Sequence, residues 1–240
     1  MRQQHKGFTL VEIAIVLVII GLLLGGILKG QELINSARVR NLADTTSGVQ
    51  AAYFGFVDRY RRVPGDWGQA AAQAAIGGTV NSGGNDNGRL DHPAGTEWTE
   101  PNALWEHLSK AGFISGSYAG PAAEPTTANG AGPFNPFNSA IVVARTAHYL
   151  DRGTATARLQ LFIGRGTPVD IARELDTKLD DSAPDTGNVR ASLETANASL
   201  AGTSGWGTGT GTCTLAAGTP PTSVWNIAAD SQDCNVVYLF

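Results

Sequence analysis

One acidic residue interrupts a long apolar run near the start of this 240-residue sequence. From Phe8 to Leu28 the sequence reads FTLVEIAIVLVIIGLLLGGIL, and Glu12 is its single ionisable residue. A carboxylate inside a bilayer costs about 2.5–3.5 kcal/mol, so it persists where a positive charge can reach it. The run itself has no cation, and the nearest basic side chains, Arg2 and Lys6, precede it. The chemistry indicated for Glu12 is therefore ion pairing rather than catalysis.

A cut between Gly7 and Phe8 would create the missing positive group. It would free an α-amino group four residues before Glu12. In a bundle of such helices, staggered along an axis, the amine of one chain would meet Glu12 of a neighbour. On this interpretation the acid is an assembly device.

The apolar run is also long enough to cross a membrane. At about 1.5 Å per residue, a helix over residues 8–28 covers about 31 Å, which matches a hydrocarbon core of about 30 Å. A cleaved secretory signal peptide is one alternative, but its apolar core would be shorter and would end at a small-residue cleavage site. A plain membrane anchor is another alternative; it fits the length and gives Glu12 no role.

The segment from Lys6 to Glu12 (KGFTLVE), with the basic leader before it and the apolar run after it, resembles a known signal. It is similar to the class III signal of type IV prepilins and type II secretion pseudopilins. The resemblance implies that a prepilin peptidase cuts after Gly7 on the cytoplasmic side and methylates the new N-terminal Phe8. It also implies that Glu12 is the glutamate that these proteins use in assembly.

The same resemblance implies a location and a set of partners. The precursor would lie in a bacterial inner membrane, with a cytoplasmic N-terminus and a periplasmic C-terminal domain, and then enter a periplasmic or extracellular filament. Its partners would be copies of itself, other pilins, the peptidase, the inner-membrane assembly platform and membrane lipid. Many major pilins have a proline partway along the mature helix. This sequence has Gly25 and Gly26 there, which favours a pseudopilin or minor pilin.

Beyond Lys29 the apolar pattern becomes amphipathic. Apolar and aromatic residues recur at helical spacing, namely Leu42, Val49, Tyr53, Phe56 and Tyr60. Pro64 and Gly65 end the pattern. We predict a cleaved basic leader (1–7), a transmembrane and filament-core helix (8–28), its amphipathic continuation (29–63) and a globular periplasmic or extracellular domain (64–240).

The globular part has the element order of an α+β domain. Glycines make residues 67–100 loop-rich. The rest predicts a helix from Thr99, strands at 140–150 and 157–163, a helix with Thr167 as its cap and Pro168 at its first position, and a closing strand at 236–240. This order suits helices on one face of an antiparallel sheet. The long N-terminal helix would be the spine on which the sheet packs, as in the pilin architecture.

Two local patterns in the globular part suggest chemistry. Asn85, Asn87 and Asp91 place side-chain oxygens around a glycine turn, which suggests a calcium loop. The full EF-hand pattern is absent, and the same residue types build ordinary turns, so a bare turn is the alternative and we predict no cofactor.

Cys213 and Cys234 would bound a loop of 22 residues. If the domain is exported, a disulfide is expected, and the resemblance implies the disulfide-bounded C-terminal region of many pilins; reduced thiols are the alternative.

No catalytic constellation is apparent. The four histidines are isolated, and the sequence has no HExxH, GxSxG or phosphate-loop pattern. A net charge of −4 does not indicate a nucleic-acid-binding protein. We therefore predict a structural subunit of a type IV pilus-type filament and no enzyme. A type II secretion pseudopilin is the first alternative, and a membrane-anchored binding domain that never polymerises is the second.

Overall fold

The computed structural model describes residues 9–91, 98–193, 213–217 and 222–240. The chain divides into two compact units, residues 1–38 and residues 39–240. One long helix, α1 (Leu10–Tyr60), contributes residues to both. Each unit is described separately below.

Helix α1 begins and ends where local chemistry predicts. The reciprocal hydrogen bonds of Thr9 and Glu12 satisfy backbone groups at its first turn. At the other end Arg61 adopts a left-handed conformation (φ +54°), and Pro64 follows three residues later. Within the second unit, one stripe of α1 is buried at spacings of three and four residues. Its members are Val39, Leu42, Ala43, Thr46, Val49, Ala52, Tyr53 and Phe56.

A four-stranded antiparallel sheet forms the centre of the second unit. Its strands are β1 (Val142–Thr146), β2 (Arg158–Phe162), β3 (Val189–Ala191) and β6 (Val236–Leu239), and their order across the sheet is β1-β2-β6-β3. The C-terminal strand β6 lies between β2 and β3, with Leu161 opposite Tyr238 and Arg190 opposite Val237. The end of the chain is therefore fixed inside the sheet.

The two faces of this sheet bury different clusters. Val143 and Leu161 belong to the cluster that includes Phe56 of α1, so this face packs on the helical spine. Alternate residues of the same strands point the other way. Among them Val142 and Phe162 pack with Trp98.

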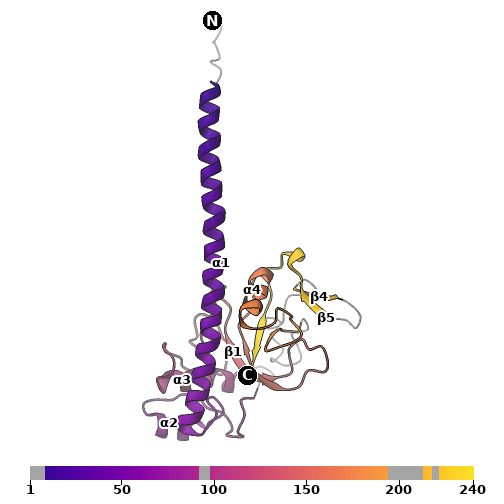
Figure 1. Cartoon of the computed structure of the whole chain (residues 1–240). Coiled ribbons are helices and arrows are strands. Elements are labelled where there is room, and N and C mark those ends of the chain that lie inside the picture. Colours follow the sequence, from indigo (N-terminus) through magenta and orange to yellow (C-terminus); the bar gives the residue numbers. More distant parts are fainter. Residues whose placement is uncertain (1–8, 92–97, 194–212, 218–221) are drawn as a thin grey trace. The chain divides into compact units, whose positions relative to one another are not determined.

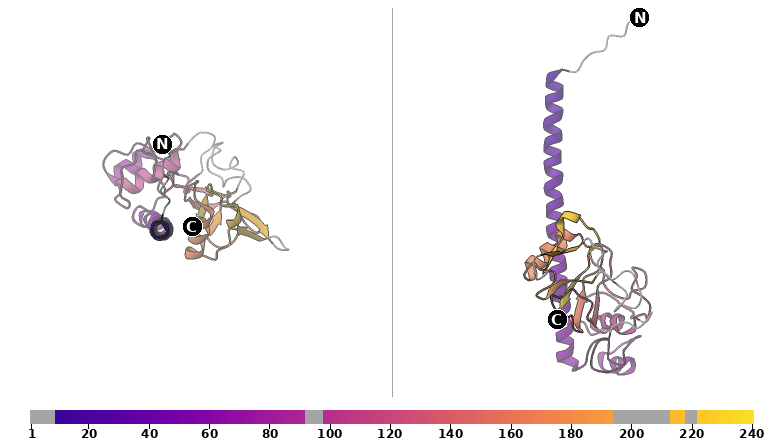
Figure 2. Two further views of the ribbon diagram at one scale, coloured as in Figure 1. Left: turned by 90° about the horizontal axis from the view of Figure 1, so that it is seen from above. Right: turned by 90° about the vertical axis from the view of Figure 1, so that its right-hand side faces the viewer.

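The remaining elements gather in two groups along the α1 segment of the second unit. Helices α2 (Gln69–Ile76) and α3 (Thr99–Lys110) lie near its C-terminal end, whereas α4 (Val169–Leu179) lies nearer its start (Figures 1 and 2). A two-stranded sheet of β4 (Thr214–Ala217) and β5 (Thr222–Trp225) lies on the α4 side, followed by the 3₁₀ turn η1 (Ile227–Ala229). The buried cluster that contains Ile171 and Leu175 of α4 also includes Trp225 and both cysteines. A second buried cluster contains Trp105 of α3.

The structure confirms the predicted α+β class, with a long N-terminal helix and an antiparallel sheet. The loop-rich interpretation of residues 67–100 was incomplete, because that stretch contains α2. In α2 only Ala72 is buried, so the helix shows no apolar periodicity from which it could be predicted. The structure also adds β3 and the β4–β5 hairpin to the predicted strands.

Candidate processing and assembly site

Glu12 and Thr9 bind each other at the start of α1. Oε2 of Glu12 accepts hydrogen bonds from the backbone N–H and the hydroxyl of Thr9, both at 2.8 Å. In return, the backbone N–H of Glu12 donates to the Thr9 hydroxyl oxygen at 3.3 Å. This arrangement is a capping box, which satisfies free backbone N–H groups of the first turn. Glu12 is exposed, and it makes no ion pair within the described part of the chain.

The first unit exposes an apolar helix surface on every side. No described residue before Val39 is buried, and the leucines, isoleucines and valines from Leu10 to Ile34 are largely exposed. Gly21 and Gly25 have open space on their side-chain face. Among the described helices, α1 is long and apolar enough to cross a membrane. Such a surface is unfavourable in water, so lipid or other helices must cover it.

Gly7 and Phe8, the predicted cleavage site, lie outside the described residues. Their roles stay predictions. Glu12 and Thr9 are described, and they place the acid at the first turn of the apolar helix.

Two pairs of closely spaced charged residues of α1, Lys29 with Glu32 and Arg40 with Asp44, lie on its exposed surface. Lys29 and Glu32 form an ion pair of 2.7 Å, with two thirds of each side chain exposed. Arg40 and Asp44 are also exposed. Within residues 9–91 and the other described segments, neither makes an ion pair. In both pairs the basic residue comes before the acidic one.

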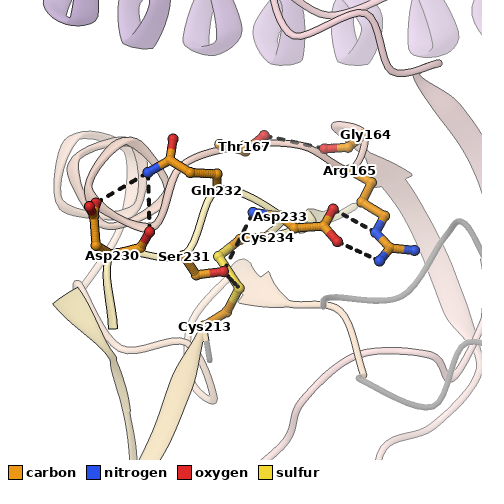
Figure 3. Close-up of a disulfide and its surroundings, with 9 residues drawn as sticks. All are labelled: Gly164, Arg165, Thr167, Cys213, Asp230, Ser231, Gln232, Asp233 and Cys234. Atoms are coloured by element: carbon orange, nitrogen blue, oxygen red, sulfur yellow. Dashed lines mark hydrogen bonds and ion pairs between the residues drawn. A yellow bond between two sulfur atoms is a disulfide. The ribbon is translucent and has the colours of Figure 1, made fainter. Parts of the chain in front are cut away.

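Cys213 and Cys234 form a disulfide, with an S–S distance of 2.06 Å (Figure 3). Cys234 and Thr167 exchange two backbone hydrogen bonds, at 2.9 and 3.1 Å, and Thr167 lies just before α4. Beside them, Nε of Arg165 donates to Oδ1 of Asp233 at 2.6 Å. The disulfide joins the residue before β4 to Cys234, and the hydrogen bonds of Cys234 with Thr167 connect both to the segment before α4.

The proposed calcium-loop residues already bind one another. Oδ1 of Asn85 accepts from the backbone N–H of Asn87, and Oδ1 of Asn87 accepts from that of Arg89, both at 3.0 Å. The Asn87 amide donates to Asp91 at 2.6 Å, and Arg89 forms an ion pair with Asp91 at 3.0 Å. These are the contacts of Asx turns. Calcium binding here stays a prediction.

Three buried carboxylates hold the same loop, and sequence reasoning missed them. Asp66 accepts from the backbone N–H groups of Asn87 and Gly88, at 3.0 and 2.8 Å. Glu100 and Glu106 of α3 accept further loop N–H groups. Burial raises the pKa of Glu100, with smaller opposing contributions from its two backbone hydrogen bonds. The carboxylates therefore fix residues 81–91 against α3.

An acidic cluster lies at the end of α4. Carboxylate oxygens of Asp176, Asp180 and Asp181 come within 4.8 Å of one another. Asp176 is buried and accepts hydrogen bonds from Trp225 Nε1 at 2.7 Å and Ser182 N at 3.1 Å. Burial is the main cause that raises the pKa of Asp176 to about 6. Both of its oxygens are engaged in holding β5 and the loop after α4.

Comparison with protein families agrees with the N-terminal geometry. Residues 2–28 match the family described as the prokaryotic N-terminal methylation motif. Comparisons with curated proteins and with solved structures found no match. The match covers the single acid at the first turn and the exposed apolar part of α1 described above. The matched motif is the prepilin-type cleavage and methylation signal of type IV pilins and pseudopilins, and it covers the leader and the first part of α1.

Proposed function

We propose that this protein is a structural subunit of a type IV pilus-type filament, assembled through packing of its N-terminal helix. The observation that carries the proposal is Glu12, the single ionisable residue of an apolar run that the structure leaves fully exposed. Lipid can cover the apolar surface of one chain, but it offers no partner for a carboxylate. A neighbouring chain offers both an apolar surface and a positive terminus.

Processing supplies that terminus. The peptidase cuts after Gly7 and methylates the α-amine of Phe8, which keeps a positive charge at neutral pH. Before the cut, the basic leader holds the N-terminus on the cytoplasmic side, in keeping with the positive-inside rule. The globular unit is then periplasmic, where the disulfide of Cys213 and Cys234 can persist. The assembly platform of the inner membrane moves the processed chain from lipid into the filament.

N-terminal analysis and one substitution test the proposal. The mature protein should begin at methylated Phe8, and Gly7→Asp should leave the precursor uncut. Glu12→Gln should be processed normally and yield at least tenfold fewer sheared filaments, since removing one partner of a buried ion pair costs about 3–5 kcal/mol. Glu174→Gln makes the same chemical change on an exposed residue of α4 and should assemble normally. A mature protein that begins at Met1, or normal filament yield from Glu12→Gln, would refute the proposal.

A type II secretion pseudopilin is the second candidate, and the lack of proline in α1 favours a pseudopilin or a minor pilin over a major pilin. Gly25 and Gly26 occupy the region where many major pilins have proline. The N-terminal chemistry is the same for both candidates, so processing does not separate them. Deleting the gene in its own host does: loss of surface filaments indicates a pilus subunit, whereas loss of protein secretion with filaments retained indicates a pseudopilin.

A further inference from the structure

Two pairs of charged residues on α1 have the same order, with the basic residue first, and nearly the same spacing. Asp44 follows Arg40 by four residues, and Glu32 follows Lys29 by three. If the chain is cut as proposed above, Glu12 follows the amine of Phe8 by four residues as well. In each case the positive group comes first. One axial offset between two parallel copies can therefore serve the two cases with four-residue spacing, Phe8 with Glu12 and Arg40 with Asp44.

This order is poorly suited to pairing within one helix. Ion pairs at four-residue spacing are more favourable when the acid precedes the base. Arg40 and Asp44 have the reverse order, and both are exposed without an ion pair in the part of the chain that the structure describes. Lys29 and Glu32 do pair at 2.7 Å, but each keeps two thirds of its side chain exposed. All four side chains can reach a second helix.

The offset follows from helix geometry. Glu12 of one copy lies level with Phe8 of a parallel neighbour when the neighbour is displaced by four residues, about 6 Å along the axis. The same displacement sets Asp44 of the first copy level with Arg40 of the second. Lys29 and Glu32 are not part of this contact, because Glu32 lies about 200° around the helix from Glu12. Without an offset, Arg40 would face Arg40 and Asp44 would face Asp44.

The surface of α1 next to Arg40 and Asp44 leaves room for a second helix to pack. Ser47 and Ala51 follow Arg40 and Asp44 at helical spacing, and both are small and exposed. Gly48 lies beside them, with open space where a side chain would project. Small residues allow close approach of two helices. Asp58 does not fit the pattern, because Phe54 lies four residues before it and its partner is Arg61 of the same chain, at 3.3 Å.

We propose that Asp44 of one copy pairs with Arg40 of the adjoining copy, in the axial register that brings Glu12 to the neighbour's N-terminal amine. The partner is a second copy of this chain, so the inference rests on the proposed filament function. The second pair lies beyond the apolar run, where water competes for the charges. Its effect is therefore to select the register, while the pair at Glu12 neutralises a charge inside the apolar core.

Charge reversal with rescue between chains tests this pairing. Arg40→Asp gives a chain with two acids at these positions, and Asp44→Arg gives a chain with two bases. Each variant alone should lose about fivefold or more of its sheared filaments, since like charges then meet at every subunit contact. Co-expression of the two should restore the yield in filaments that contain both chains, because every base again faces an acid. No internal pair is restored in either chain, so rescue reports contact between copies.

Two controls complete the test. Asp58→Arg reverses an exposed acid of the same helix that has no base four residues before it, and it should assemble normally. Cross-linking between a chain with Arg40→Cys and a chain with Asp44→Cys should exceed cross-linking between a chain with Arg40→Cys and a chain with Ser47→Cys. Normal filaments from both reversals, no rescue on co-expression, or the opposite cross-linking order would overturn the pairing. Normal filaments from Glu12→Gln would instead overturn the proposed function, so the two failures are distinguishable.

Discussion

Trp225 donates its indole N–H to Oδ2 of Asp176 at 2.7 Å, and this bond joins the end of β5 to the buried side of α4. The backbone N–H of Ser182 donates to the other oxygen at 3.1 Å. Burial dominates and raises the pKa of Asp176 from 3.8 to about 6, whereas the bond from Trp225 acts in the lowering direction. The contact that positions the hairpin therefore depends on a carboxyl group that titrates at mildly acidic pH.

The first prediction is a stability that decreases as this group ionises. Because its folded-state pKa lies above the unfolded value, the folded chain holds more protons between pH 3.8 and about 6. The contribution of Asp176 to the free energy of unfolding is therefore complete below pH 3.8 and is lost as pH rises through about 6. Thermal unfolding of the detergent-solubilised full chain over this range should show the decrease, and Asp176→Asn should remove it. Asp170→Asn, on the exposed side of the same helix, should keep it. Parallel curves for the parent and Asp176→Asn would contradict the assignment.

The second prediction concerns Asp66, which is 1% exposed and holds the loop through the N–H groups of Asn87 and Gly88. Asp66→Ala removes the charged acceptor of both donors and leaves the Asn87 N–H with the neutral oxygen of Asn85 alone. Hydrogen bonds to charged groups contribute about 1.5–3 kcal/mol each, so we expect the free energy of unfolding to fall by about 2–4 kcal/mol. Denaturant titration measures it. Asp58→Ala, an exposed acid of α1, should change it by less than about 0.5 kcal/mol. Equal effects of the two substitutions would show that the loop does not depend on Asp66.

Sequence reasoning succeeds where one physical effect dominates a long segment. The apolar run and the stripe of apolar and aromatic residues from Leu42 to Tyr60 predict α1. Helices that face lipid and helices that face a protein core each show a characteristic pattern over many residues. Glu12 stands out for the same reason, since a lone charge contrasts with its surroundings. Its bond to Thr9 also has a sequence signature, T-x-x-E, from which the capping box could have been predicted.

The missed features depend on contacts between distant residues. Asp66 and Asn87 are 21 positions apart, and Asp176 and Trp225 are 49 apart. Nothing near Asp66 in the sequence distinguishes a buried acceptor from a solvated acid. Helix α2 is short and alanine-rich, so intrinsic propensity rather than apolar spacing forms it. The local pattern around Asn85 likewise predicts a turn but does not decide whether that turn binds an ion.

The third prediction compares two glycines with almost the same backbone angle φ. Gly65 has φ +90° and Gly77 has φ +87°. A Cβ at Gly65 would lie 2.5 Å from the backbone oxygen of Glu100, whereas a Cβ at Gly77 meets nothing within 4 Å. We expect Gly77→Ala to cost about 1–3 kcal/mol through the backbone conformation alone, because φ +87° with ψ +158° is a combination that essentially only glycine adopts. Gly65→Ala should cost about 3–5 kcal/mol, since overpacking against backbone adds to the strain. Denaturant titration of both variants measures the difference, and similar losses would show that α3 can move away from Gly65.

The fourth prediction separates the two roles that the structure gives Glu12. Its carboxylate caps α1 through Thr9, and its charge is proposed to bind a neighbouring amine. Glutamine can replace glutamate in a capping box, so Glu12→Gln keeps the cap and removes the charge. Thr9→Ala keeps the charge and removes the side-chain partner, at a cost of about 1 kcal/mol to the helix start.

If assembly depends on the charge, Thr9→Ala should form filaments at close to the parent yield, whereas Glu12→Gln should not. If the cap is what matters, the order is reversed. Quantifying sheared filaments from both variants, with N-terminal sequencing to verify that each is processed, decides between the two roles. Equal and large losses would mean that the first turn must be both folded and charged, and the double variant would then lose no more than either single one.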